Sequence, residues 1–258
     1  MNKLNRFGLQ TVALVTMTID HIGKMLIPMK SPLFDIFFYI GRIAMPLFAL
    51  MIAEGFRHTS NIKRYLGRLL FFGLIIELFY FLFALVSGNS MKIALNIFLT
   101  FFVALLILTL LKDKRWYIKI MALIPFCLMI ITDIFVRDIV IFGVRYWINF
   151  EYSFYALFLV LWFGFFKNSW LQALGIIIST CLFCETLLID NQGLFAFMKL
   201  ENLYLVGKWQ QWALLAIPFI LLYSGKKGKI AYPRYFFYFY YPLHMVFLYG
   251  IYFMIYVL

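Results

Sequence analysis

The sequence has few charged residues: Asp, Glu, Lys and Arg together make up 13% of its 258 residues. In a soluble domain about a quarter of the residues are charged, so this chain has too little polar surface to cover a globule in water. Hydrophobic residues account for 65% of the chain, and the mean hydropathy is +0.93. A water-soluble fold is therefore excluded, and we expect most of the surface to face lipid.

Cysteine is also scarce, with three residues, all of them in apolar runs. Cys181 and Cys184 have CxxC spacing, but in "STCLFCETLL" this spacing is also that of neighbours on one helix. We interpret these two residues and Cys127 as small buried hydrophobic residues rather than as redox groups. The first apolar run is too long for a cleavable signal peptide and lacks a small-residue cleavage site.

Motifs of several enzyme and binding classes are absent as well. The chain has no Walker or Rossmann glycine pattern, no HExxH motif and no GxSxG nucleophile. Its three histidines are scattered without matching acids, so we expect no metal site. The net charge of +12 would suit nucleic acid in a soluble protein, but no OB, KH or zinc-finger pattern accompanies it, and we expect no nucleic-acid partner.

Long apolar runs are what the sequence has in abundance, and about 20 such residues in a helix cross a bilayer. The runs predict an all-α fold: a polytopic transmembrane helix bundle of about nine spans in a single domain, residues 1–258. The predicted spans are 7–28, 32–55, 66–86, 92–111, 117–135, 149–166, 170–189, 210–224 and 235–257. The stretch "GLFAFMKLENLYLVGKW" before the eighth span fits an interfacial helix or a broken span, so eight to ten crossings remain open.

Basic residues lie unevenly on the two sides of these spans. With the N-terminus inside, the cytoplasmic segments hold fifteen Lys and Arg residues and the outer segments hold seven. Because cytoplasmic connections carry the excess of Lys and Arg, we expect the N-terminus in the cytoplasm and the C-terminus outside. High usage of Phe, Ile, Lys and Asn is typical of an AT-rich bacterium, so the expected location is a bacterial cytoplasmic membrane.

Polar and ionisable side chains from five predicted spans share one depth band. They are Asp20, His21, Arg42, Asn96, Thr100, Glu151, Tyr152 and His244. Charged groups in hydrocarbon are costly, so they normally pair, face the bundle interior and mark a site or a pathway. The shared depth predicts one buried site that opens toward the outer side of the membrane.

The sequence leaves the roles within this band open. Asp20 and His21 diverge by about 100° on a helix, so they cannot both face one partner. Asp20 pairs with Arg42, either as a structural tie between two spans or as part of the site, while His21 or His244 faces the cavity. A buried histidine is alternatively a satisfied core residue. Glu77 is a lone acid at mid-span whose partner the sequence does not name.

A second polar cluster lies on the predicted cytoplasmic side, in "MIAEGFRHTSNIKRYLGRLL". Its members are Glu54, Arg57, His58, Lys63, Arg64 and Arg68. The first three share a helix face, because they are spaced at i, i+3 and i+4. One interpretation is a loop that is basic only because it is cytoplasmic. The other is a clamp for the phosphates of a nucleotide or coenzyme A, which arginine binds bidentately.

Two long stretches, "LVTMTIDHIGKML" and "YIGRIAMPLFALMIAEGFRHTSNIKRYLGRLL", carry a family resemblance. They are similar to the MxIDHIG and GRxxxPxFxxxxxEGFxxTxNxxxYxxRL patterns of the TraX family, and "LNIFLT", "LYSGKKG" and "RYFFYFYYPLH" resemble further family segments. The resemblance covers most of the chain. In "NFEYSFYALFLVL" the chain departs from the family's D-Y-G-x-Y-G segment, with Glu151, Ser153 and Ala156 in place of Asp, Gly and Gly.

This resemblance implies an activity. The family's pilin member is an N-acetyltransferase that acts on the pilin amino terminus, and the wider fold resembles membrane acyltransferases of the heparan-glucosaminide acetyltransferase and acyltransferase-3 types. We therefore expect an enzyme, an acetyltransferase that uses cytoplasmic acetyl-CoA. Its acceptor would be an amine or hydroxyl of a peptide, envelope glycan or lipid at the outer side. A proton-coupled small-molecule transporter and a non-catalytic assembly factor are the alternative functions.

In the expected mechanism the basic cluster holds the phosphates of acetyl-CoA, and the polar band carries the chemistry. The expected catalytic residues are His21, His244, Asp20, Arg42 and Asn96, and the expected acceptor contacts are Glu151 and Tyr152. One of the two histidines is the base, because the pKa of histidine lies near neutrality. Asp20 orients the imidazole or balances Arg42, and Arg42 or Asn96 binds the oxyanion. Direct transfer and a route through acyl-histidine both fit.

Overall fold

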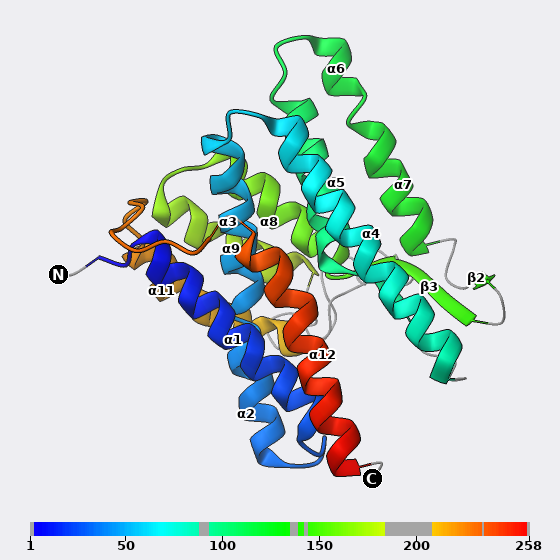
Figure 1. Cartoon of the computed structure of the whole chain (residues 1–258). Coiled ribbons are helices and arrows are strands. Elements are labelled where there is room, and N and C mark those ends of the chain that lie inside the picture. Colours follow the sequence, from blue (N-terminus) through cyan, green and yellow to red (C-terminus); the bar gives the residue numbers. More distant parts are fainter. Residues whose placement is uncertain are drawn as a thin grey trace.

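The computed structural model describes residues 3–87, 93–134, 139–141, 144–183, 208–233 and 235–256. Helices make up most of this part of the chain (Figure 1). They are α1 (Arg6–Leu26), α2 (Pro32–Gly41), α3 (Ala44–His58), α4 (Ile62–Ser87), α5 (Ile97–Leu111), α6 (Trp116–Ile120), α7 (Leu123–Ile134), α8 (Ser153–Phe165), α9 (Ser169–Phe183), the 3-10 helix η2 (Lys208–Ala216), α11 (Ile217–Leu222) and α12 (Phe236–Tyr256). They form a helix bundle, as the apolar runs predict.

Each predicted span overlaps one helix or a pair of consecutive helices. Three helical stretches in the described part are long and apolar enough to cross a membrane: Pro32–His58, Ile62–Leu82 and Trp116–Asp133. Shorter apolar helices accompany them at Ile97–Leu111, Ser153–Phe165, Ser169–Phe183 and Trp209–Leu222. Residues 193–207, which lead into the eighth predicted span, lie outside the described part.

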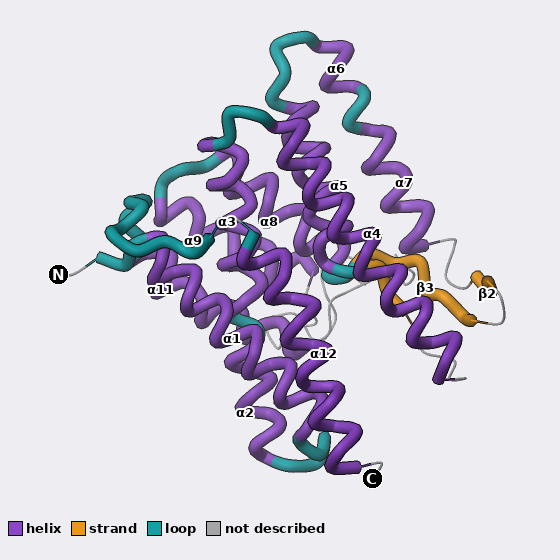
Figure 2. The backbone as a smooth tube through the Cα atoms, in the orientation of Figure 1, coloured by secondary structure: helices purple, strands orange, loops and turns teal. Residues whose placement is uncertain are grey.

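Two predicted spans begin too early, because strands form where their first residues lie. β1 (Ile93–Leu95) runs parallel to β3 (Val144–Phe150), and β2 (Ile139–Ile141) pairs antiparallel with β3. A short apolar and aromatic stretch such as "VRYWINF" fits a strand as well as a helix. The all-α prediction is therefore right for the bundle but misses a small three-stranded sheet, drawn in orange in Figure 2.

The second predicted span is a broken helix. α2 ends at Gly41 and α3 begins at Ala44, with a tight turn at Arg42 between them. A Cβ atom at Gly41 would collide with Asp20, so the missing side chain allows α1 and α2 to approach closely. The break brings the guanidinium of Arg42 against the carboxylate of Asp20.

The core centres on α5 and α8, which pack against each other and against α3. Both helices are predominantly apolar and bury residues along their length. A Cβ atom at Gly164 would lie 2.5 Å from Leu108, so these two helices also meet at a glycine. Close backbone approach at small residues is typical of helices packed in a membrane, where lipid provides no hydrophobic drive between them.

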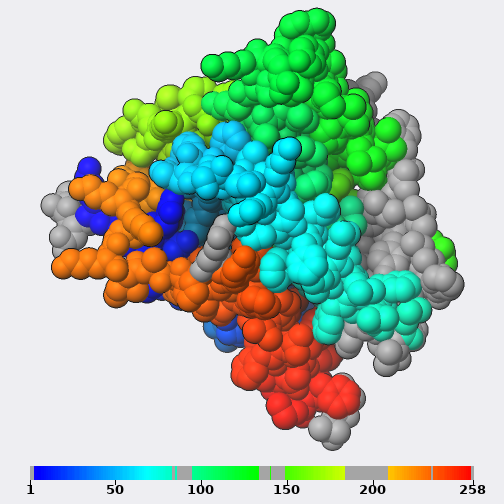
Figure 3. Space-filling model, turned by 45° about the horizontal axis from the view of Figure 1, so that its top comes forward, coloured from blue at the N-terminus to red at the C-terminus, as the bar shows by residue number. Residues whose placement is uncertain are grey.

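Large apolar side chains cover the outer faces of α4, α7 and α12. Examples are Phe71, Leu74 and Leu78 on α4, Leu123 and Ile124 on α7, and Leu243, Phe247 and Phe253 on α12. Figure 3 shows α4 in cyan and α12 in red at the surface of the molecule. Helices that expose such faces are stable in lipid rather than in water, so the chain is a membrane protein.

The cysteines differ in part from expectation. Cys127 is exposed on α7, so its predicted burial is wrong, and lipid is the expected neighbour of its apolar side chain. Cys181 is a half-buried free thiol on α9. Cys184 lies outside the described residues, and with it the CxxC pair.

Connections that the charge pattern assigns to one side of the membrane gather at one end of the bundle. The backbone N–H of Arg6 donates to the carbonyl of Lys226 over 2.8 Å, and Arg57 donates to the carbonyl of Phe166 over 3.1 Å. At the opposite end, the hydroxyl of Tyr256 donates to the last carbonyl of α1 over 3.0 Å. These contacts match the alternating helix directions of a chain that crosses a membrane repeatedly (Figure 1).

Candidate active site

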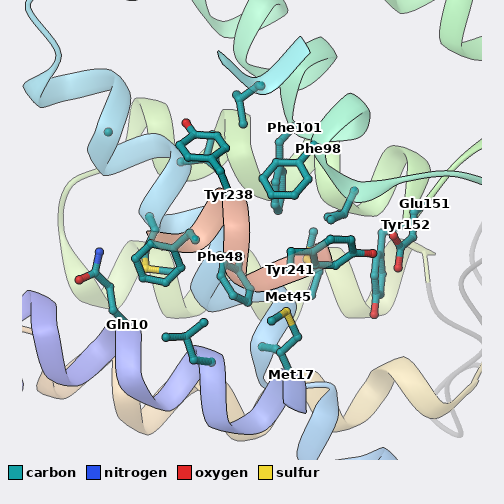
Figure 4. Close-up of a pocket in the computed structure, with 18 of the residues that line it drawn as sticks. Gln10, Met17, Met45, Phe48, Phe98, Phe101, Glu151, Tyr152, Tyr238 and Tyr241 are labelled. Carbon is teal, nitrogen blue, oxygen red and sulfur yellow. The ribbon is translucent and has the colours of Figure 1, made fainter. Parts of the chain in front are cut away.

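A cavity of about 420 Å³ lies between α1, α3, α5 and α12 (Figure 4). Its volume is within the usual range of small-molecule pockets. One end of the cavity, called the basic end below, is lined by Arg6, His58 and Arg68. The other end, called the polar end, is lined by Asp20, His21, Glu151 and Tyr152. The cavity therefore joins the two clusters that the sequence places at different depths.

The wall between the two ends is apolar. It is built largely from methionine and aromatic side chains, including Met17, Met45, Met51, Phe48 and Phe98. Figure 4 shows Met45 and Phe48 between Gln10 on one side and Glu151 on the other. Methionine is flexible and polarisable, so such a wall can adapt to a thin, partly apolar ligand.

One face of α1 runs along the whole cavity. Arg6, Gln10, Leu14, Met17 and His21 line it, spaced at intervals of four, four, three and four residues. Residues at these intervals lie on the same side of a helix. Sequence reasoning missed Arg6 and Gln10 as site residues, although this stripe is visible in the sequence.

Two histidines are brought together from opposite ends of the chain, the half-buried His21 and the buried His244. Nδ1 of His21 on α1 lies 2.7 Å from Nε2 of His244 on α12. His21 lines the cavity, whereas His244 lies behind it and is buried. Nδ1 of His244 lies 2.8 Å from the backbone carbonyl of Tyr240, one turn earlier on α12. The expected proximity of the two histidines is thus present in the structure.

Asp20 and Arg42 form a buried ion pair, as one interpretation of the sequence expects. The second carboxylate oxygen of Asp20 accepts from Nζ of Lys24 over 2.5 Å. Arg42 also donates to the hydroxyl of Tyr152 over 3.1 Å and to Oε1 of Gln210 over 3.3 Å. Both oxygens of Asp20 are engaged by cations, so Asp20 balances charge beside the cavity and does not hold an imidazole.

Asn96 lies at the start of α5 and does not line the cavity. Its side chain accepts from the N–H of Phe98 over 3.0 Å and caps the helix. Its Nδ2 donates to the carbonyl of Gly73 over 2.8 Å and to Oε1 of Glu77 over 2.7 Å. Glu77 therefore has the partner that the sequence does not name, and the expected oxyanion role of Asn96 finds no support in its position.

The basic cluster after α3 is only partly assembled at the cavity. Arg57 bonds to Glu54 and to the carbonyls of Phe163 and Phe166, and so completes the end of α8. Lys63 and Arg64 are exposed on α4 and do not line the cavity.

His58 and Arg68, by contrast, do line the cavity, together with Arg6. Nε of Arg68 is buried and has no hydrogen-bond partner among the described residues. Of the six residues expected to bind the donor, two therefore face the cavity. Arg6 is the basic side chain that the sequence analysis overlooked.

The turn before α8 presents Glu151 and Tyr152 to the cavity. The N–H of Glu151 donates to the carbonyl of Leu95 over 2.9 Å, and its carbonyl accepts from Thr100 over 2.9 Å. Tyr152 and Ser153 have φ angles of 57° and 37°, in the left-handed region that favours glycine. Glycine, which the similar TraX pattern has where Ser153 stands, adopts such angles without strain.

Comparison with known proteins agrees with the sequence motifs. A family described as TraX protein matches residues 6–252. A relative from Dichelobacter nodosus, described as "Probable fimbrial assembly protein FimC, serogroup H1", is 26% identical over 249 residues, which cover 94% of this chain and 93% of the relative. No solved structure matches the chain. The family match spans nearly the whole sequence, and this chain belongs to the TraX family.

Proposed function

We propose that this protein is an integral membrane acyltransferase that moves an acetyl group from acetyl-CoA to an amine or hydroxyl of an acceptor. The observation that carries the proposal is the cavity that runs from basic side chains at one end to His21 at the other. A phosphorylated donor with a long, thin arm fits such a cavity. A proton-accepting group is then present where the arm ends.

The dimensions of the cavity support acetyl-CoA as the donor. Arg6 and His21 are 15 residues apart on α1, a distance of about 22 Å at the helical rise per residue. The extended pantetheine arm, with about a dozen bonds, reaches roughly 16 Å, and an arginine side chain adds about 6 Å. Phosphates held by Arg6 and Arg68 would thus leave the thioester close to His21.

The chemistry needs one base and one path for the proton. His21 accepts the proton of the acceptor amine or hydroxyl as this group attacks the thioester carbonyl. The new C–N or C–O bond forms, the C–S bond breaks, and the departing thiolate takes the proton from His21. Glu151 and Tyr152 line the same end of the cavity and would contact the acceptor.

The charge pattern and the relative together support a location and an acceptor class. Basic residues concentrate at the end of the bundle that holds Arg6 and Arg68, which we assign to the cytoplasm of a bacterium. Acetyl-CoA is then available at the basic end, and the acceptor arrives from the outer side. The D. nodosus relative is described as a probable fimbrial assembly protein, so a peptide of a fimbrial subunit is the first acceptor to test.

The direct test is acetyl transfer by the purified chain. Protein in lipid nanodiscs is incubated with acetyl-CoA labelled in the acetyl group. The free thiol of the released coenzyme A measures turnover, and the label on the acceptor measures transfer. In parallel, mass spectrometry compares extracytoplasmic peptides and glycans from cells with and without the protein. We expect acceptor-dependent thiol release and one class of acetylated molecule that disappears without the protein. Transport of a solute with no consumption of acetyl-CoA would instead indicate a transporter.

A separate prediction concerns donor binding at the basic end. Replacing Arg68 with alanine is expected to raise KM for acetyl-CoA about 10–100-fold with little change in kcat, because a charge-assisted hydrogen bond to phosphate is lost. Steady-state kinetics in nanodiscs measure both constants. Lys114→Ala is the matched control, since Lys114 is exposed at the same end and does not line the cavity. Equal KM values for the two variants would contradict donor binding by Arg68.

A further inference from the structure

The two histidines are linked in a chain of hydrogen bonds whose direction can be worked out. The carbonyl of Tyr240 can only accept, so Nδ1 of His244, 2.8 Å away, carries a proton and donates. In the neutral ring, Nε2 of His244 then has a lone pair and accepts. Nδ1 of His21, 2.7 Å from this nitrogen, must therefore be the donor.

We propose that His244 is a positioning residue that holds His21 in the Nδ1–H form, so that Nε2 of His21 carries the lone pair used as the base. The inference rests on the proposed function for its chemical meaning. It also assigns different roles to His21 and His244, either of which the sequence allows as the base. His21 touches the reacting atoms, whereas His244 acts through His21.

The orientation of His244 is itself determined by α12 and α1. The ring of Tyr240 stacks on His244 with centroids 5.1 Å apart, and the Tyr240 hydroxyl lies 2.7 Å from Oγ1 of Thr18. Thr18 is three residues before His21 on α1. Hydrogen bonds therefore join α1 to α12 on two successive helical turns, Thr18 to Tyr240 and His21 to His244. These contacts restrict rotation of the His244 ring and keep its Nε2 directed at His21.

A carboxylate would be the more familiar group to orient an imidazole, and Asp20 is the neighbour of His21 in sequence. Both oxygens of Asp20 are engaged by Arg42 and Lys24, however. Adjacent residues on a helix also point in directions about 100° apart. A neutral imidazole on α12 therefore takes the place that a carboxylate has in a triad.

The arrangement also suits the protonated state. When Nε2 of His21 takes a proton from the acceptor, His21 becomes an imidazolium, and its Nδ1–H still donates to the lone pair of His244. This bond is then charge-assisted and stronger than the bond in the neutral pair. The base is thus stabilised in the form that it has during acyl transfer, by a partner that is itself neutral.

Nuclear magnetic resonance of histidine tests the proposal without an activity assay. The chain has three histidines, so full-length protein labelled with ¹³C and ¹⁵N in histidine, in nanodiscs, gives few signals, and His58→Gln assigns one of them. We expect His21 and His244 in the Nδ1–H form near neutral pH. In His244→Phe, which has no acceptor, His21 should shift to the Nε2–H form that free imidazole prefers in water. In His244→Gln, whose carboxamide oxygen can accept, His21 should remain Nδ1–H.

The kinetic counterpart uses the same variants. His244→Phe is expected to lower kcat at least tenfold with KM for acetyl-CoA nearly unchanged, and His244→Gln to recover most of the loss. An Nε2–H form of His21 in the wild-type protein would overturn the proposal, and so would an unchanged tautomer in His244→Phe. If the tautomers are as expected but no acceptor is acetylated, the proposed function fails and the positioning of His21 stands.

Discussion

Replacing His21 with alanine is expected to lower kcat for acetyl transfer by about 10²–10⁴-fold, the usual contribution of a general base. His21 is the histidine at the polar end of the cavity, and its ring is held by His244. Without it, the acceptor must attack the thioester with its proton still bound or lose the proton to water. The rate of thiol release in nanodiscs, at saturating acetyl-CoA, measures the effect.

Controls separate this chemical loss from damage to the fold. His21→Gln keeps a polar side chain of similar size and should be as inactive as His21→Ala, because a carboxamide is not a base. Val15→Ala, on the exposed face of the same helix, should keep the wild-type rate. A rate within a few-fold of wild type in both His21 variants would show that another group is the base.

Replacing Asp20 with leucine is expected to lower the free energy of unfolding by about 3–5 kcal/mol, the cost of leaving a buried charge without its partner. Arg42 is buried and would keep its positive charge beside an apolar side chain. Lys24 is less affected, because its side chain is 35% exposed and can turn toward water. Denaturation in mixed detergent, followed by circular dichroism, gives the free energy of unfolding.

The double variant Asp20→Leu/Arg42→Met sharpens this test. With both charges removed, most of the lost stability should return, since an apolar pair of similar volume often replaces a buried ion pair without cost. Asp113→Ala is the matched control on the exposed connection after α5. The Arg115 side chain hydrogen-bonds Asp113 and lowers its pKa to about 2, yet the pair lies in solvent and its loss should have no measurable effect. A double variant as unstable as Asp20→Leu would contradict the pairing.

The features of the site that could be predicted from the sequence are those that depend only on a residue's position on its own helix. Helical periodicity shows that Asp20 and His21 point in different directions, and depth along a span shows that His244 lies level with them. Both conclusions are local, because they need only the position of a residue on its own helix. The stripe from Arg6 to His21 on α1 was equally readable, but Arg6 was counted only among the basic residues that indicate topology.

Hydrogen-bond partners on neighbouring helices could not be predicted in this way. Asn96 shares the depth of His21 but caps α5 and bonds to Glu77, and Arg57 belongs to a basic run but completes the end of α8. Depth and charge do not specify which neighbouring helix a side chain meets. Short apolar runs near 93–95 and 144–150 were equally ambiguous between helix and strand.

By itself, the sequence determined that this is a membrane-embedded helical chain and where its apolar segments lie. It also identified the polar groups whose high free-energy cost in lipid indicates a site. These properties follow from composition and from periodicity along one helix. Only the tertiary structure decided that His21 meets His244, that Arg42 also bonds to Tyr152 and Gln210, and that one cavity joins the basic residues to the histidine. Those outcomes depend on how the helices pack against each other, because a hydrogen bond between side chains 223 positions apart is set by the arrangement of α1 and α12 and not by either helix alone.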